Sequence, residues 1–208
     1  PRQQRKPSAL VCGLTIHGLA VARSLALHGV SVHAFARRER WRNPTTYTRY
    51  ARVHFREKLN SDDLIAHLRD FARDLPGTGK VVLFPTSDRM AGTIGRHWAE
   101  LQDRYLLSWA HCRELVLALQ LKDNLPAYAD RAGVRYPRTA VVTSAADSTH
   151  TAALLRMPVV IKPARPLSAF KAIIVRDLAG LDKVVSQYSA DLPFVVQEFI
   201  EGDEGSLY

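Results

Sequence analysis

Residues 158–163 read Pro-Val-Val-Ile-Lys-Pro, and residues 194–204 read Phe-Val-Val-Gln-Glu-Phe-Ile-Glu-Gly-Asp-Glu. The run Val159–Ile161 consists of β-branched residues that suit a buried strand, and Lys162 follows it directly. A lysine at the end of a strand is ordinarily an exposed residue whose stem lies along apolar surface. Here a second apolar strand follows and runs into an acidic segment. We therefore expect the two strands to bring a cation together with hinge donors and acceptors.

These two motifs, preceded by LKDNLPAYADRAGVRYPRT at residues 121–139, resemble the ATP-grasp superfamily and, more closely, its carboxylate–amine ligase branch. The three motifs stand in the order that the family has, and the resemblance covers most of the chain. It implies an α/β fold in which a Rossmann-like parallel-sheet domain is followed by a small α+β ATP-grasp lid. We expect the first domain at residues 8–110, and the linking helices and lid at residues 111–208.

The resemblance also implies a reaction. In that family ATP phosphorylates a carboxylate, and an amine then displaces phosphate from the acyl phosphate. ATP and Mg²⁺ would be the cofactors, and a small-molecule carboxylate and amine the substrates, with a homo-oligomer left open. No catalytic residue is assigned. The residues that the resemblance assigns to ATP are Lys122 and Lys162 for the phosphates, the main chain of Glu198, Phe199 and Ile200 for adenine, and Glu204, with Glu201 as its substitute, for ribose.

Two features depart from the family's pattern. The family usually has Asp-Lys at its first motif, whereas here Lys122 is followed by Asp123, so a helix-surface role for Lys122 is the alternative. A cation near a helix start is not explained by the helix dipole, which prefers anions there. The second feature is the loop before the third lid strand, which lacks the glycines that fold over phosphates in many members. The side chains that would replace them are Arg165, Ser168 and Lys171; otherwise the lid binds nucleotide poorly.

In the family the Mg²⁺ ligands lie on a further lobe after the hinge. The chain ends at Tyr208 and begins at Pro1, so we expect it to be the N-terminal portion of a longer enzyme. The metal ligands are then expected downstream of Tyr208, and the 208 residues alone are expected to be inactive.

The N-terminal residues predict a parallel βαβ unit, with Ala9–Cys12 as a strand and Gly13–Gly18 as the turn into a helix. Two glycines fit the dinucleotide fingerprint G-x-G-x-x-G, but Thr15 occupies its middle position. Arg37 and Arg38 stand where that fingerprint expects an acid, which would favour a 2′-phosphate. An NADP-type oxidoreductase therefore stays as an alternative function.

Polar residues follow the apolar strand predicted at residues 80–84. In open α/β sheets, ligands bind beyond the carboxyl ends of the strands. Thr86, Ser87 and Asp88 are therefore candidates for binding the non-nucleotide substrate. The alternative is that Ser87 or Asp88 only caps the next helix.

The composition is that of a globular domain, with 47% hydrophobic and 24% charged residues. The net charge of +9 predicts an anionic partner, such as a nucleotide or an acidic metabolite. Basic residues are mostly scattered and lack interleaved aromatics, so nucleic acid is not expected as the main partner. A non-catalytic anion-binding module is a third function class that this sequence fits.

No apolar run approaches the length of a membrane helix, roughly 18 residues, and the first ten residues lack the apolar centre of a signal peptide. We therefore expect a cytoplasmic protein without membrane partners. The two cysteines, Cys12 and Cys112, stand in different settings and do not suggest a disulfide framework, so both are expected to be reduced thiols.

Overall fold

The structure is a computed structural model that describes residues 6–38, 43–75, 79–165 and 170–202. The chain divides into two compact units, residues 1–117 and 118–208, and each has its own sheet and hydrophobic core. None of the helices in the described ranges is long and apolar enough to cross a membrane.

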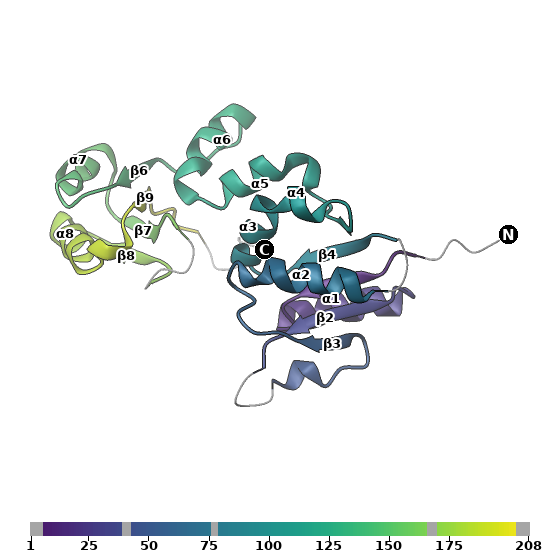
Figure 1. Ribbon diagram of the computed structural model, residues 1–208. Coiled ribbons are helices and arrows are strands. Elements are labelled where there is room, and N and C mark those ends of the chain that lie inside the picture. The colour runs from purple at the N-terminus through teal and green to yellow at the C-terminus, as the bar shows by residue number, and fades with distance from the viewer. Residues whose placement is uncertain (1–5, 39–42, 76–78, 166–169, 203–208) are drawn as a thin grey trace. The chain divides into compact units, whose positions relative to one another are not determined.

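Unit 1 contains a parallel sheet with the strand order β3-β2-β1-β4-β5 (Figure 1). Its central strand β1 is buried along its whole length, as expected for an apolar strand covered on both faces. The order reverses beside β1, and ligands of such folds bind at the carboxyl ends of the strands there. The strands are β1 (Ala9–Cys12), β2 (Val32–Ala36), β3 (Arg52–Phe55), β4 (Val81–Pro85) and β5 (Tyr105–Leu106).

Helices cover both faces of this sheet. Helix α1 packs on one face, where small residues such as Ala22 and Ala34 allow close approach. Helices α2 and α3 pack on the other face over a core that includes Leu10 and Phe35. The predicted Rossmann-like parallel sheet is therefore confirmed. The helices of unit 1 are α1 (Ile16–Leu27), α2 (Asp63–Asp74), α3 (Asp88–Arg96), α4 (Trp98–Leu101) and α5 (Arg113–Leu119, which runs into unit 2), with 3-10 turns η1 (Pro44–Thr46) and η2 (Ala110–Cys112).

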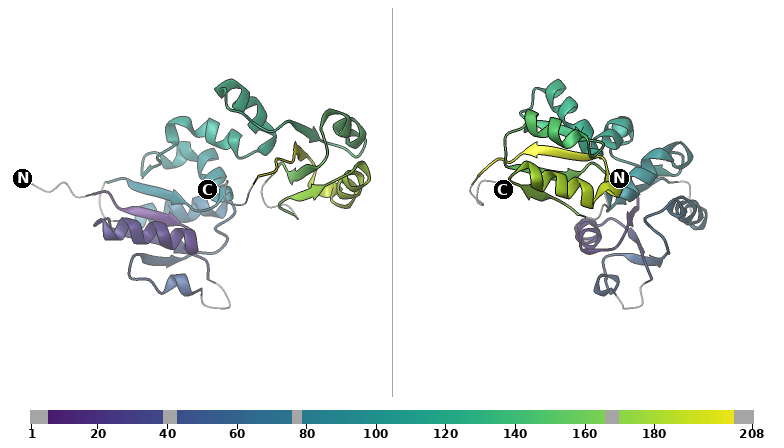
Figure 2. Two further views of the ribbon diagram at one scale, coloured as in Figure 1. Left: turned by 180° about the vertical axis from the view of Figure 1, so that it is seen from behind. Right: turned by 90° about the vertical axis from the view of Figure 1, so that its left-hand side faces the viewer.

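Unit 2 contains a four-stranded antiparallel sheet with the order β6-β9-β7-β8, and α7 and α8 cover one side of it (Figure 2). This arrangement confirms the predicted small α+β lid. Its elements are η3 (Lys122–Asn124), α6 (Leu125–Ala132), β6 (Thr139–Val142), α7 (Asp147–Leu154), β7 (Val159–Pro163), β8 (Ile173–Val175), α8 (Leu178–Gln187), η4 (Ser189–Asp191) and β9 (Phe194–Glu198).

Two element boundaries in unit 2 concern the site. Lys122 lies in a 3-10 turn and helix α6 begins only at Leu125, because Pro126 has no N–H and suits the first turn of a helix. Strand β8 begins at Ile173, which leaves Lys171 exposed before it.

Candidate functional site

Lys162 lies on β7, and its position follows from the alternation of side chains along a strand. Val159 and Ile161 are buried in the core of unit 2. Val160 and Lys162 therefore belong to the opposite face of the sheet, and both are half-buried. The strand thus fixes the lysine on the face that α7 and α8 leave uncovered.

A polar side chain of β9 meets this lysine. The amine of Lys162 donates a hydrogen bond to Oε1 of Gln197 over 2.9 Å. Gln197 is only 5% exposed, although it stands in an otherwise apolar strand. A buried amide requires hydrogen-bond partners for both of its ends. Its Nε2 donates to the hydroxyl of Thr139 on β6 over 3.1 Å, so three neighbouring strands contribute to one chain of contacts.

The groups at the two ends of this row of hydrogen bonds determine which atom donates and which accepts in each bond. Thr139 donates its single hydroxyl proton to the carbonyl oxygen of Pro137 over 2.7 Å, so the hydroxyl oxygen is left to accept from Gln197. At the other end the ammonium group can only donate, so it requires the amide oxygen. We call Pro137, Thr139, Gln197 and Lys162 the lysine relay.

The hinge begins where β9 ends at Glu198. The N–H of Glu198 donates to the carbonyl of Arg138, and the N–H of Phe199 donates to the carbonyl of Pro158, each over 3.0 Å. Both N–H groups therefore already donate to carbonyl groups within the lid. Among the described residues, the N–H of Ile200 has no hydrogen-bond partner, and this residue is 69% exposed. Of the three predicted hinge donors, Ile200 is the one that could bind a ligand without breaking a contact.

Lys122 is brought to the end of β7 by its main chain. Its N–H donates to the carbonyl of Ala164 over 3.1 Å, two residues after Lys162. The next residue, Asp123, has a buried Oδ1 without a hydrogen-bond partner in the described part of the chain. Such a group is costly unless a donor from water or a ligand reaches it. The sequence drew attention to Asp123 only as a departure from the family's pattern.

The other residues predicted to bind ATP are exposed or lie outside the described ranges. Lys171 and Glu201 are exposed, and Glu204 lies outside the described residues, as does Ser168. Phe170, directly before Lys171, packs against Tyr188 and Phe194 with ring centroids 4.8 and 5.4 Å away. This packing fixes the point at which the chain returns to β8.

In unit 1, two of the predicted substrate residues have structural partners. The hydroxyl of Thr86 lies 2.7 Å from the carbonyl oxygen of Cys12 and 2.9 Å from that of Gly13. Ser87 caps α3 by accepting from the N–H of Met90, and it donates to Asn60 over 2.9 Å. The capping role weighed from the sequence is thus present for Ser87. Asp88 lies in the first turn of α3, where an acid suits the helix dipole.

A pocket of about 330 Å³ lies at the carboxyl ends of β1 and β2. The cations Arg37 and Lys58 line it together with the amides of Asn43 and Asn60. Lys58 has a positive φ of 50°, which is uncommon for a residue with a side chain. Sequence reasoning found Arg37 but missed the other three, because they come from loops that no periodic pattern marks.

The glycines of the first turn have structural roles. Gly13 has a φ of +97°, and a Cβ there would lie 2.4 Å from Oγ1 of Thr86. A Cβ on Gly18 would lie 2.1 Å from the carbonyl oxygen of Gly13. The tight turn and the close packing of helix on strand account for these two glycines of the fingerprint. Thr15 replaces the glycine that would let a pyrophosphate approach.

No protein-family model matches the sequence, and no curated protein matches it. Solved structures do match. N5-carboxyaminoimidazole synthetase from Staphylococcus aureus, complexed with ADP, has a TM-score of 0.69 at 14% identity and covers 94% of this chain and 47% of its own. L-amino acid ligase from Bacillus licheniformis has 0.65 at 15% identity, with 96% and 46% covered. The biotin carboxylase domain of the Hydrogenobacter thermophilus 2-oxoglutarate carboxylase, with MgADP, has 0.69 at 14%, with 96% and 45% covered.

The chain thus spans a little under half the length of the solved structures that it matches. At these identities the likeness concerns the fold. Both sheets of the chain take part in it, because more than nine-tenths of the chain is covered. The chain therefore shares its fold with a part of each of these synthetase, ligase and carboxylase structures.

Proposed function

We propose that this chain, which has the fold of the N-terminal portion of an ATP-grasp enzyme, binds ATP for a ligase that joins a carboxylate to an amine. The observation that carries the proposal is Lys162, a half-buried cation held by Gln197 on the face of the lid sheet opposite α7 and α8. Lys122 is tied to the end of the same strand, and the N–H of Ile200 lies just beyond β9. The two lysines suit the phosphates of ATP, and the N–H of Ile200 suits adenine.

The chemistry proceeds in two steps. A carboxylate oxygen attacks the γ-phosphorus of ATP, and the bond to the β-phosphate oxygen breaks, which gives an acyl phosphate and ADP. The amine then attacks the acyl carbon, phosphate leaves with the electron pair of the C–O bond, and the amine loses a proton. The protein mainly positions the reactants and neutralises charge. Lys122 and Lys162 would do this for the phosphates of ATP.

Mg²⁺ would supply positive charge that offsets the charge of the phosphates in such a reaction. The residues that the structure describes include no group of three or more His, Cys, Asp or Glu side chains that could hold a metal ion. We therefore derive no step through Mg²⁺ from these residues. The carboxylate substrate would bind in the pocket with Arg37 and Lys58, because two cations and two amides suit an anion.

Two measurements test this function. Calorimetric titration of the protein with ATP and with ADP should show saturable binding, and NADPH should show none. ADP release in the full-length protein, with Mg²⁺ and a panel of carboxylates and amines, should require both substrates for full turnover. Binding without turnover in any combination would favour the non-catalytic module. Saturable NADPH binding without ATP binding would favour the oxidoreductase.

A further inference from the structure

A large hollow of about 1300 Å³ lies in unit 1 at the amino ends of the strands, away from the edge where ligands of this fold usually bind. Residues at the starts of β1, β2, β3 and β4 and at the end of α2 line it. None of the residues discussed for ATP or the carboxylate belongs to it. Two histidines are among the residues that line it, His33 on β2 and His54 on β3.

The two histidines form a pair on one face of the sheet. Nδ1 of His33 lies 3.0 Å from Nε2 of His54, and the two rings stack with centroids 5.2 Å apart. Phe71 of α2 packs edge-on against both, at 5.1 and 5.2 Å. The aromatic contacts hold both imidazoles in one orientation, so the remaining nitrogens, Nε2 of His33 and Nδ1 of His54, have fixed positions.

The number of protons on the two histidines decides how many N–H groups they can offer to a ligand. When both rings are neutral, one shared proton fills the short contact, and the two outer nitrogens carry one N–H between them. When the pair gains a single further proton, the contact is kept and both outer nitrogens become donors. The singly charged pair therefore presents two N–H groups and a positive charge, which is what an oxyanion requires.

The charged surroundings favour an anion over a metal ion. Arg52 is exposed beside the pair, and it makes no hydrogen bond or ion pair with any residue in the described ranges. Arg56 lies over the ring of Phe35, at 5.5 Å from its centroid. Lys6 and Lys80 also line the hollow, with their amines bound to the carbonyls of His28 and Gln102. The lining carries one carboxylate, Asp74.

Burial is the main cause that lowers the pKa of each histidine, and the cation of Arg52 lowers both further. For His54 the neighbouring His33 and Arg56 act in the same direction, and Asp74 acts against them. The pair is therefore neutral at pH 7. An anion bound at Arg52 would offset the cation and raise both pKa values, so binding and protonation favour each other.

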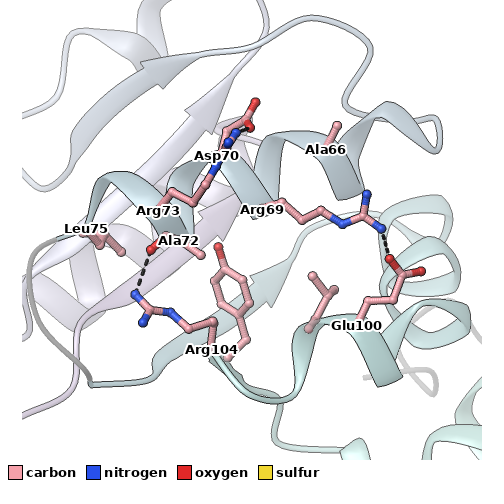
Figure 3. A pocket seen from close by; sticks show the side chains of 10 residues that line it. Ala66, Arg69, Asp70, Ala72, Arg73, Leu75, Glu100 and Arg104 are labelled. Atoms are coloured by element: carbon pink, nitrogen blue, oxygen red, sulfur yellow. Dashed lines mark hydrogen bonds and ion pairs between the residues drawn. The ribbon is translucent and has the colours of Figure 1, made fainter.

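A second hollow, of about 770 Å³ between α2 and α4, lacks these properties (Figure 3). There Arg69 pairs with Glu100, Arg73 pairs with Asp70, and Arg104 donates to the carbonyl oxygen of Ala72. Its arginines are thus bound to groups of the protein itself. In the histidine hollow, by contrast, Arg52 and the imidazole pair are positioned to bind a ligand.

We propose that His33, His54 and Arg52 form a binding site for a phosphate group, one that takes up a proton when it is filled. The phosphate comes either as the free ion or as part of a small phosphorylated metabolite, for which the hollow has room. This site is independent of the proposed ATP site.

Sulfate is the probe for the proton uptake, because it has the shape of phosphate but keeps its charge between pH 5.5 and 8. Calorimetry in two buffers of different ionisation enthalpy gives the number of protons bound with sulfate. We expect affinity to rise as the pH falls from 8 to 5.5, by up to about tenfold, which is the factor that one pKa unit of coupling gives once the pH lies below the pKa of the free pair. Titrations with inorganic phosphate and with ribose 5-phosphate then distinguish the two sources, the tighter ligand being the better match.

Three variants test whether sulfate binds at the proposed site. Arg52→Gln should weaken sulfate binding by about 10- to 100-fold, the usual range for a lost charge-assisted contact. His54→Phe keeps the aromatic packing but removes one of the two imidazoles, so it should reduce proton uptake. Arg23→Gln, which removes an equally exposed charge from α1, should change neither. Because Arg52 is exposed, its variant should fold, and that keeps the test valid if His54→Phe does not.

The proposal is overturned if sulfate does not bind at millimolar concentration at pH 6. It is equally overturned if Arg52→Gln and Arg23→Gln weaken binding alike, since that would mean general attraction to a basic protein. Undiminished proton uptake in folded His54→Phe would assign the proton to another group and would also contradict it.

Discussion

The amine of Lys162 and the side-chain oxygen of Gln197 lie 2.9 Å apart, on adjacent antiparallel strands whose register sets Val160 opposite Gln197. Gln197 cannot turn its amide over without losing Thr139 as well, because its Nε2 donates to that hydroxyl. The lysine is therefore held in place before any nucleotide arrives. Such pre-organisation reduces the entropy that binding has to offset.

Lys162→Ala should weaken ATP binding by about 10- to 100-fold, because it removes a charge-assisted contact worth roughly 1.5–3 kcal/mol. Calorimetric titration with ATP and magnesium measures the effect. The matched control is Lys183→Ala, an exposed lysine of α8 in the same unit. An unchanged affinity in folded Lys162→Ala would return this lysine to the role of an ordinary strand-end residue.

Thr139→Val should also weaken ATP binding, by less than Lys162→Ala and about 3- to 10-fold, because a neutral side-chain hydrogen bond contributes about 1 kcal/mol. Valine keeps the shape of threonine but cannot accept the proton of Gln197. Thr139→Ser restores the hydroxyl and should recover most of the affinity. If valine and serine behave alike, the relay does not position the lysine.

The fold was largely predictable because its signals are local. The β-branched run at Val159–Ile161 marks a strand by itself, and the turn glycines mark the start of α1. The order of the four lid strands, by contrast, is given by the structure and by no residue pattern.

The site was predictable only in part, because its contacts join residues far apart in the chain. Lys162 was found by its place in a motif. Its partner Thr139 becomes visible only once the register of β6 on β9 is known. The pairing of His33 with His54 likewise depends on the register of two strands. Single glutamines and histidines in apolar strands are nevertheless a usable signal, since burial forces them to find partners.

Gly18→Ala should destabilise unit 1 by about 2 kcal/mol, in the range of overpacking in a tight core. The added Cβ would lie 2.1 Å from the carbonyl oxygen of Gly13 and 3.2 Å from a methyl of Val11. Gly79→Ala is the control, because a Cβ there meets nothing within 4 Å. Urea unfolding followed by circular dichroism compares the two. Equal stabilities would mean that α1 can move away from β1 at little cost.

The two cysteines should differ sharply in reactivity. Complete burial raises the pKa of Cys12 to about 12, so its reactive thiolate is scarcely populated at pH 8. Cys112 is half-buried at η2 and carries a free thiol. Titration of the folded protein with a thiol-specific disulfide reagent should count one fast thiol, and the unfolded protein two. Two fast thiols under native conditions would show that β1 opens readily.

The carboxylate of Asp147 should make unit 2 less stable in acid. The hydroxyl of Thr143 and the N–H groups of Thr143 and Ser144 donate to its Oδ2 over 2.7–2.8 Å. These bonds favour the ionised form and lower the pKa of Asp147 to about 2, with the Thr143 hydroxyl as the largest cause. An unfolded Asp has a pKa of about 3.9, so the folded state holds the proton less tightly.

The stability contributed by Asp147 is therefore fully present above about pH 5 and is lost as the pH falls from about 4 to about 2. NMR titration of the side-chain carboxyl carbon should give a midpoint near 2 in the folded protein. Asp147→Asn should lower stability at pH 7 and flatten its dependence on pH below 4, whereas Asp182→Asn, at an exposed position of α8, should leave that dependence in place. A carboxyl midpoint near 4 would mean that the loop at residues 143–147 is open in solution, and that α7 begins without this bond.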